Sequence, residues 1–232
     1  MPPNSTISRF DSIDVVVPVY NEARILPTFY ERISRIELPL NLIFVDNASR
    51  DGSVAFIESL AEVTLIRHRS NEGYGASLLD GIRRATAEAI VIIDADCEFP
   101  PEAIPQLIDA LEDHPVVYGS RFMGGAAPAM PLLRRVGNGA ISGLFNLLFR
   151  QNLTDLYTGF KALRRAALKD LSLTRKGFEH VLELGVRLAQ AGVTIHEVPI
   201  VYEPRHTGRS KMNHVAETAK FISLLLKYRI AG

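Results

Sequence analysis

Two aspartates at the end of an aliphatic segment are the residues of this sequence best suited to chemistry. Asp94 and Asp96 follow the run AIVII, and Glu98 stands two residues further on. Carboxylate oxygens are the ligands that Mg²⁺ and Mn²⁺ prefer, and a diphosphate commonly supplies the remaining ones. We therefore expect Asp94, Asp96 and Glu98 to hold a divalent cation. In the alternative, which an isolated pair of aspartates would favour, Asp94 caps the helix that begins near Pro100 and Asp96 is only solvated.

Acidic and other polar residues follow two further apolar segments in the same way. The run VVVPVYNE spans residues 15–22, and NLIFVDNASRDGS spans residues 41–53. A short apolar run is typical of a buried parallel strand, and parallel strands present their carboxyl ends at one edge of a sheet, where ligands bind. We expect three strand ends to deliver carboxylates to one edge.

Strands and helices are predicted to alternate along the chain. Short apolar runs are separated by segments with apolar residues near helical spacing, which are residues 23–36, 53–62, 74–88 and 101–114. This pattern predicts an α/β, Rossmann-like fold with a mostly parallel sheet flanked by helices. The stretch GGAAPAMP, residues 124–131, is expected to be a mobile loop between a nucleotide-binding half and an acceptor-facing half.

The composition limits the class of protein. The chain has 232 residues, is 47% hydrophobic and carries no formal net charge, which suits one globular domain and gives nucleic-acid binding little electrostatic support. A single cysteine, Cys97, excludes an internal disulfide. The first residues lack the features of a signal peptide, and no apolar run reaches the length of a membrane span. These observations predict a cytoplasmic protein.

Eight short motifs follow one another along the chain. They are PVYNE (18–22), VDNASRDGS (45–53), NEGYGAS (71–77), DADCEFP (94–100), GSRF (119–122), TDLYTGFKALRR (154–165), EVPIVY (197–202) and PRHTGRSK (204–211). In this order and spacing the chain resembles family 2 glycosyltransferases of the GT-A fold, and within them the polyprenyl-phosphate sugar synthases of the dolichol-phosphate mannose type. The resemblance implies an inverting transfer of a hexose from a nucleotide diphosphate sugar such as a GDP- or UDP-hexose, assisted by Mg²⁺ or Mn²⁺.

The resemblance also implies a donor site. Strand ends and glycine-rich turns would form it, through Pro18, Tyr20, Glu22, Asp46, Gly73, Gly75 and Asp94, while Asp96 and Glu98 bind the metal. For residues 18–22 the alternative is strand-end packing. Arg205, Arg209 and Lys211 look like a loop that closes over the diphosphate, or else a solvated basic loop. Asn47 and Glu98 depart from the family pattern, which usually has Asp and Gln there.

The acceptor site is expected around Arg121 and Asp155. Arg121 follows a strand and could bind a phosphate with two hydrogen bonds, or else form a surface ion pair with an acidic neighbour. Asp155 is the candidate base if the acceptor is a hydroxyl, although a phosphate acceptor needs none; a helix cap is the alternative. Asn138 stands where mannosyl members carry an arginine, and Arg134 or Arg135 could substitute for it.

Two apolar segments raise the question of membrane contact. Residues 139–149 and 215–228 have wide apolar faces with basic residues nearby, so both could lie at a bilayer surface or serve as core or dimer helices. We expect a catalytic domain at 1–212 and an amphipathic helix at 213–232. The leading hypothesis is a metal-dependent hexosyltransferase acting on a polyprenyl phosphate at the cytoplasmic membrane face. The alternatives are a soluble or hydroxyl acceptor, or a nucleotide-sugar-binding protein without turnover.

Overall fold

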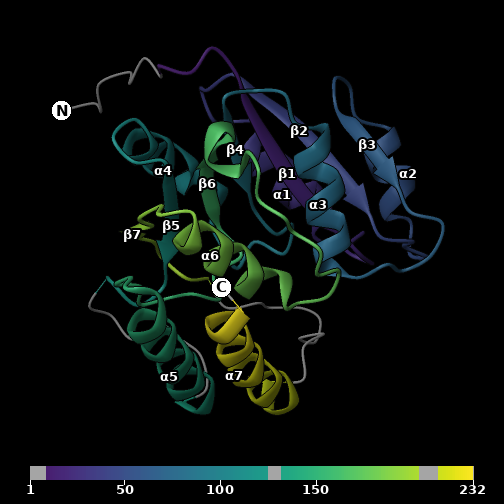
Figure 1. Cartoon of the computed structure of the whole chain (residues 1–232). Coiled ribbons are helices and arrows are strands. Elements are labelled where there is room, and N and C mark those ends of the chain that lie inside the picture. The colour runs from purple at the N-terminus through teal and green to yellow at the C-terminus, as the bar shows by residue number, and fades with distance from the viewer. Residues whose placement is uncertain (1–8, 125–131, 204–213, 232) are drawn as a thin grey trace.

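One sheet of seven strands forms the centre of the computed structural model, which describes residues 9–124, 132–203 and 214–231 (Figure 1). The strands lie in the order β3-β2-β1-β4-β6-β5-β7. Their bounds are β1 Ile13–Val19, β2 Leu40–Asp46, β3 Thr64–Arg67, β4 Ala89–Ile92, β5 Val116–Ser120, β6 Lys161–Arg164 and β7 His196–Pro199. The helices are α1 Leu26–Ile33, α2 Ser53–Glu58, α3 Tyr74–Arg84, α4 Ile104–Leu111, α5 Leu132–Phe149, α6 His180–Gln190 and α7 His214–Ala231.

The sheet is mostly parallel, which confirms the expected α/β fold. β1 pairs in parallel with both β2 and β4, and β5 pairs in parallel with β7. β6 alone among these strands runs antiparallel to its neighbours, with Lys161 opposite both Ile92 of β4 and Tyr118 of β5. The first residue of β6 therefore lies at the edge where the parallel strands end. That edge is the one at which ligands are expected.

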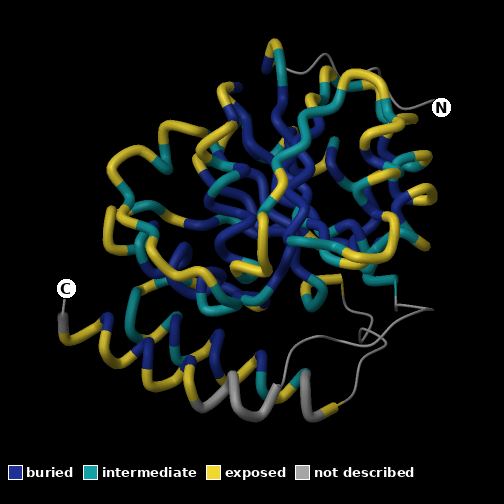
Figure 2. Tube along the Cα trace, turned by 90° about the vertical axis from the view of Figure 1, so that its right-hand side faces the viewer, coloured by how far each residue is buried: buried dark blue, intermediate teal, exposed yellow. Residues whose placement is uncertain are grey.

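Helices cover both faces of the sheet, and two apolar clusters hold them there. The first cluster packs α1, α2 and α4 against one face and contains Phe29 and Phe44. The second packs α3, α5, α6 and α7 against the other face and contains Phe145 and Phe221. In Figure 2 the buried residues, drawn in dark blue, lie in the middle of the domain, and exposed residues, drawn in yellow, lie around them. Because β1 and β4 are buried on both faces, they are almost wholly aliphatic, as the sequence predicts.

The C-terminal helix is joined to this core along one side. Phe221, Leu224, Leu225 and Tyr228 of α7 are buried in the second cluster, while Ile230 is 86% exposed. Figure 2 shows this alternation of buried and exposed residues along the helix. Among the described helices, none combines the length and the apolar content that crossing a bilayer requires. The predicted loop at 124–131 lies, apart from Gly124, outside the described residues.

Candidate active site

A cavity of about 470 Å³ opens at the carboxyl ends of β1 and β4. Its walls come from five separate regions of the sequence. The lining residues are Pro18, Val19, Tyr20, Glu22, Asn47, Asn71, Gly73, Tyr74, Ser77, Asp94, Ala95, Asp96, Glu98, Gly177 and Phe178. The structure thus brings most of the predicted donor and metal residues to one place, as expected for polar residues at parallel strand ends.

The three carboxylates after β4 all reach the cavity. Asp94, Asp96 and Glu98 line it and are partly exposed, while Ala95, which also lines it, and Cys97 and Phe99 are buried. The helix-cap alternative for Asp94 is wrong, because its Oδ1 accepts a hydrogen bond from the Tyr74 hydroxyl at 2.9 Å and no side chain caps the helical turn after Pro100. Asp96 is not merely solvated, since its Oδ1 accepts the backbone N–H of Glu98 at 3.0 Å.

Both side-chain oxygens of Asp94 contact neighbouring residues, and the ionised form of this carboxylate is unfavourable at that place. Tyr74 binds one oxygen, and its ring stacks on Phe178 at 5.4 Å between centroids. The backbone of Gly159 packs against the other oxygen so closely that a Cβ at that position would overlap it. Burial and repulsion from Asp96 raise the pKa of Asp94 to about 7. A cation or another positive group at this place would relieve that cost.

The charges of the cavity suit a divalent cation. Four carboxylates line it, those of Glu22, Asp94, Asp96 and Glu98, whereas its described lining holds no lysine, arginine or histidine. In the described part of the chain no three acidic, histidine or cysteine side chains come close enough to hold a metal by themselves. The predicted set of Asp94, Asp96 and Glu98 is therefore not preassembled, and a ligand would have to complete the coordination.

A second cavity of about 730 Å³ adjoins the first, and Tyr20 and Asn71 line both. Asp46 lies in its wall, nearly inaccessible to solvent, with its carboxylate bound to the backbone N–H of Ser49. Asn47, where the family usually has an acid, accepts the backbone N–H of Glu72 at 2.8 Å and donates to Asn71 Oδ1 at 3.0 Å. Asn47 thus fixes the segment that forms the shared wall.

The glycines of the NEGYGAS motif have different places. Gly73 lines the cavity with a φ of 101°, a backbone conformation that favours glycine. Gly75 lies beneath the cavity, where a Cβ would meet the backbone of residues 175 and 177. Its small size therefore lets the segment before α6 cross the start of α3, and that segment supplies Gly177 and Phe178 to the cavity.

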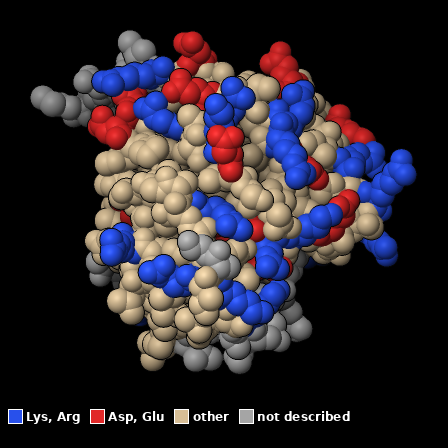
Figure 3. All heavy atoms as spheres, in the orientation of Figure 1, with Lys and Arg blue, Asp and Glu red and all other residues tan. Residues whose placement is uncertain are grey.

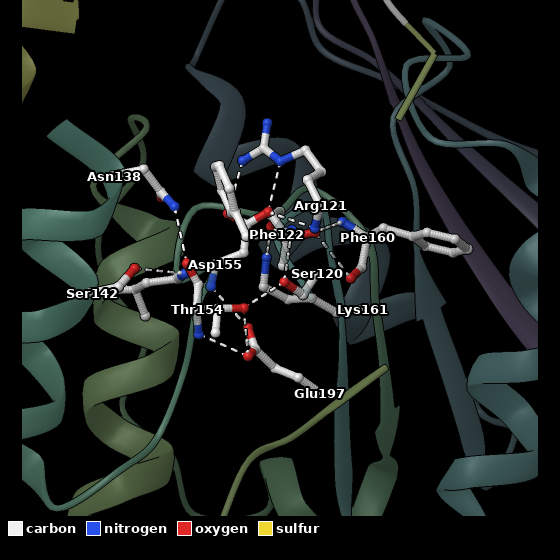
Figure 4. A network of polar contacts seen from close by, with 12 residues as sticks. Ser120, Arg121, Phe122, Asn138, Ser142, Thr154, Asp155, Phe160, Lys161 and Glu197 are labelled. Carbon is white, nitrogen blue, oxygen red and sulfur yellow. Dashed lines mark hydrogen bonds and ion pairs between the residues drawn. The ribbon is translucent and has the colours of Figure 1, made fainter. Parts of the chain in front are cut away.

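Arg121 and Asp155 form a buried ion pair beside the ends of β5 and β6 (Figure 4). Arg121 Nε donates to Asp155 Oδ2 at 2.6 Å, and Nη2 donates to Oδ1 at 2.8 Å. The Asp155 side chain is 0% exposed and that of Arg121 is 13% exposed. The alternative of a surface ion pair is wrong for Arg121, because its acidic partner Asp155 is fully buried. The helix-cap alternative for Asp155 is wrong, because this residue lies in a loop that leads into β6.

Neighbouring elements fix the loop that carries Asp155. Glu197 on β7 accepts the backbone N–H groups of Thr154 and Asp155, at 2.7 and 2.8 Å. From α5, Asn138 Nδ2 donates to the Thr154 carbonyl at 3.2 Å, so the described contact of Asn138 is to this loop. Figure 4 shows the loop between Arg121 on one side and Glu197 on the other.

Lys161 is a buried cation between the two groups of carboxylates. Its side chain is nearly inaccessible, its Nζ donates to the Thr158 carbonyl, and the ammonium lies 4.7 Å from the centre of the Tyr118 ring. Burial lowers the pKa of Lys161 to about 8, while attraction to Asp94 and Asp155 opposes that shift. Lys161 is therefore attracted both to a carboxylate of the first cavity and to the carboxylate that pairs with Arg121.

The structure does not describe every predicted site residue. Arg205 and Lys211, together with Arg209, lie outside the described residues, as does the side chain of Arg134. Arg135 is half-buried on α5. Sequence reasoning missed Lys161 and Glu197 as parts of the site. The signal for both was a charged residue beside apolar ones, Lys161 after Phe160 and Glu197 before Val198, which indicates a buried polar network.

Comparison with known proteins shows the family to which the chain belongs. The family model described as Glycosyl transferase family 2 matches residues 14–172. Dolichol-phosphate mannosyltransferase of Pyrococcus furiosus is 30% identical over 227 residues, which are 93% of this chain and 64% of that protein. Undecaprenyl-phosphate mannosyltransferase of Micrococcus luteus is 30% identical over 209 residues, covering 85% of this chain and 86% of that one. This chain thus spans slightly less than two thirds of the archaeal relative's length.

Solved structures confirm the fold. Glucosyl-3-phosphoglycerate synthase of Mycobacterium tuberculosis, in complex with Mn²⁺, uridine-diphosphate-glucose and phosphoglyceric acid, superposes with a TM-score of 0.71 at 20% identity, over 94% of this chain and 79% of that one. The mostly parallel sheet, with a carboxylate-lined cavity at the carboxyl ends of its strands, defines an α/β domain of the type that binds ligands at strand ends. Within that class, the chain belongs to glycosyl transferase family 2, as the sequence predicts.

Proposed function

We propose that the protein transfers a hexose from a nucleotide diphosphate sugar to a polyprenyl phosphate, with a divalent cation. Four relatives, each 30–31% identical, are named as dolichol-phosphate, undecaprenyl-phosphate or polyprenol monophosphomannose enzymes, which supports this acceptor class. The observation that carries the proposal for this chain is the state of Asp155, whose two oxygens are both occupied by Arg121.

An acceptor hydroxyl would need a base, and Asp155 is buried and paired with Arg121, so it is poorly placed to serve as one. Its carboxylate is fully buried, and Arg121 also donates its backbone N–H to Oδ2 at 3.2 Å. A phosphate acceptor is already an anionic nucleophile and needs no proton removed. The occupied carboxylate therefore favours a phosphate over a hydroxyl.

Arg121 retains a second edge for such an anion. Its Nη1 has no hydrogen-bond partner among the described residues, and Figure 4 shows a guanidinium nitrogen turned away from Asp155. The rings of Phe99, Phe122 and Tyr202 lie 5.4 to 5.8 Å from the guanidinium carbon. Asp155 and the rings hold one orientation, so a phosphate on the free edge would be placed without further ordering of the arginine.

The donor side needs positive charge from its ligands. A diphosphate in the first cavity would meet four carboxylates and no basic side chain in the described lining. Asp94, Asp96 and Glu98 would hold the cation, since their oxygen donors suit Mg²⁺ or Mn²⁺, and the cation would neutralise charge on the leaving diphosphate. The acceptor phosphate oxygen forms a bond to the anomeric carbon, and the bond from that carbon to the diphosphate breaks, with its electron pair leaving on the diphosphate. This direct displacement inverts the anomeric centre.

The outer side of α5 and α7 is the proposed contact with a lipid surface. Leu132, Val136 and Leu147 on α5 and Ile222, Leu226 and Ile230 on α7 are exposed. Lys227 and Arg229 are exposed beside them. On the face shown in Figure 3, most acidic side chains lie toward the opposite end of the molecule. Apolar residues bordered by basic ones suit a membrane surface with anionic headgroups.

The proposed function is tested by the release of nucleoside diphosphate. GDP- and UDP-hexoses are each incubated with Mg²⁺ or Mn²⁺, with and without farnesyl phosphate as a short polyprenyl phosphate. Release that depends on metal and farnesyl phosphate, and that Asp96→Ala abolishes, is the expected result. Asp113→Asn, an exposed aspartate in the turn before β5, is the matched control that should keep wild-type release. Metal-dependent release without stimulation by farnesyl phosphate would contradict the acceptor class and favour a soluble one.

A separate assay tests the lipid surface. The wild-type chain should sediment with vesicles that contain anionic phospholipid. Ile230→Glu should lower the fraction that sediments with them at least about threefold. Ser223→Glu places the same charge on an exposed position of α7 without removing an apolar contact, so it should lose less binding. Equal binding of Ile230→Glu and wild type would contradict the proposed surface.

A further inference from the structure

A buried glutamate outside the cavity organises the acceptor side. Glu197 lies on β7, is 7% exposed and does not line the cavity. Its Oε1 accepts the Asp155 N–H at 2.8 Å, and its Oε2 accepts the Thr154 N–H at 2.7 Å and the Thr154 hydroxyl at 2.9 Å. One carboxylate thus binds three donors from two consecutive residues, one of which is the partner of Arg121.

The same glutamate is connected to the turn that carries Arg121. An ionised carboxylate only accepts hydrogen bonds, so the Thr154 hydroxyl donates to Glu197 and must accept from the Ser120 hydroxyl, which lies within hydrogen-bond distance of it. Ser120 Oγ in turn accepts the backbone N–H of Phe122 at 3.1 Å. The Ser120–Phe122 turn and the Thr154–Asp155 turn are therefore both oriented from Glu197.

An amide at position 197 could not replace this arrangement. Both carboxylate oxygens accept from backbone N–H groups, whereas glutamine has one oxygen and one NH₂ group. In a glutamine variant a donor would face a donor, and one buried N–H would lose its partner. The two turns would then be free to shift relative to each other, and placements of reacting groups tolerate little error.

We propose that Glu197 is the positioning residue of the acceptor site: it fixes the mutual orientation of Arg121 and Asp155, and thereby the edge of Arg121 that binds the acceptor phosphate. This inference rests on the proposed function. It predicts that loss of the Glu197 carboxylate weakens acceptor binding and leaves nucleotide binding intact.

A second buried glutamate provides a matched comparison. Glu183 on α6 is fully buried and accepts the N–H and hydroxyl of Thr174 and the N–H of Arg175, at 2.9, 3.0 and 2.7 Å. Like Glu197, Glu183 binds donors from a threonine and the residue after it, but both N–H groups go to its Oε2, while its Oε1 accepts the hydroxyls of Thr174 and Tyr228. The segment that Glu183 holds leads to Gly177 and Phe178 in the cavity wall. Glu183 therefore supports the donor side as Glu197 supports the acceptor side.

The experiment compares Glu197→Gln with Glu183→Ala in direct binding. Calorimetry measures the affinity for farnesyl phosphate, and separately for GDP and UDP with Mn²⁺. Glu197→Gln is expected to weaken farnesyl phosphate binding at least about tenfold and to leave diphosphate binding within about twofold of wild type. Glu183→Ala removes every acceptor that Thr174 and Arg175 use there, so its larger loss is expected for the diphosphate. A purely structural role would weaken both ligands alike in both variants.

A milder substitution keeps the inference testable if Glu197→Gln does not fold. Thr154→Val retains the side-chain volume but removes the hydroxyl that joins Glu197 to Ser120. It is expected to weaken farnesyl phosphate binding about threefold, with unchanged diphosphate binding. Wild-type affinity for farnesyl phosphate in a folded Glu197→Gln, or in Thr154→Val, would overturn the inference.

The failure of the inference differs from failure of the proposed function. If the wild-type chain binds farnesyl phosphate and Glu197→Gln binds it equally well, Glu197 has no positioning role and the proposed function stands. If the wild-type chain binds GDP or UDP with Mn²⁺ but no farnesyl phosphate, the acceptor class is wrong, and the role given to Glu197 falls with it.

Discussion

The proposed donor and acceptor sides of the site differ in the sign and the burial of their charges. On the donor side, four carboxylates line an open cavity without a basic side chain in its described lining, and the pKa of Asp94 is raised to about 7 by burial and by Asp96. On the acceptor side, Asp155 and Arg121 are paired and buried, and Glu197 has its hydrogen bonds satisfied. In the proposed function the cavity obtains its basic charge from its ligands, whereas the arginine and the carboxylate of the acceptor side both belong to the chain.

This difference accords with the order of charges in the proposed reaction. A diphosphate brings several negative charges and a cation brings compensating ones, so a negative cavity discriminates against a diphosphate without its cation. The acceptor contributes a single phosphate group, which one arginine would bind. An arginine binds such a group most tightly when it is already held in one orientation. The following predictions test the contrast, beginning with the largest expected effect.

Removing charge from the donor side should have the largest effect. Asp96→Asn keeps the shape of the side chain but weakens its attraction for a cation, so turnover should fall about 10²–10³-fold. The loss should be partly offset at high Mn²⁺ concentration, which a metal titration of the initial rate measures. An unchanged rate at every metal concentration would show that Asp96 does not serve the cation.

A change in the acceptor-side loop should also damage the donor side. In Gly159→Ala the new methyl group overlaps Asp94 Oδ2, so the carboxylate must move and turnover should fall about 10²-fold. Gly143→Ala on α5, where nothing lies near the added Cβ, is the control and should be near wild type. Calorimetry of GDP and UDP with Mn²⁺ locates the defect. Normal diphosphate binding and normal rate in Gly159→Ala would separate the two sides more completely than we propose.

Breaking the buried pair should have a smaller effect than removing a metal ligand. Asp155→Asn leaves Arg121 without its anionic partner, and farnesyl phosphate transfer should fall about tenfold, mainly through a higher KM for the acceptor. If Asp155 were a base for a hydroxyl acceptor, the loss would be at least about 100-fold and would appear in kcat. The split between kcat and KM in initial-rate data decides between these roles.

Protonation should affect stability through a histidine behind the donor side. Burial lowers the pKa of His180 to about 4, so the folded chain resists a proton that the unfolded chain accepts near pH 6.5. Stability should therefore fall as pH decreases from about 6.5 to about 4, by about 3 kcal/mol from this residue. Denaturant unfolding at several pH values measures the loss. His180→Leu, which binds no proton, should show a smaller decrease over the same range, and an identical decrease would contradict this assignment.

The sequence predicts the donor side better than the acceptor side, and the reason is physical. Polar residues after buried parallel strands must meet at one edge, so Tyr20, Asp46 and Asp94 could be placed from local patterns. The ion pair of Arg121 with Asp155 joins residues 34 positions apart, and no local pattern specifies that contact. The antiparallel direction of β6 was likewise not predicted, because four residues, KALR, carry too little periodicity.

Packing explains the remaining differences. Lys161 and Glu197 lie in motifs of the sequence without a predicted role, since what they do depends on contacts that only the folded chain creates. Gly75 was expected near the nucleotide, but the demand for a small residue arises from the segment before α6 that crosses it. Such demands come from tertiary contacts, whereas sequence patterns report on the local chain.

The reversed direction of β6 has a consequence for how new specificities can arise. The chain leaves the ligand edge at Ser120, at the end of β5, and returns to it at Lys161 on the adjacent strand β6. The segment between these two residues is continuous, carries α5 and the Asp155 loop, and has both of its ends on adjacent strands. In the proposed function, replacing this segment would change the acceptor preference and leave the order of the strands and the nucleotide site as they are.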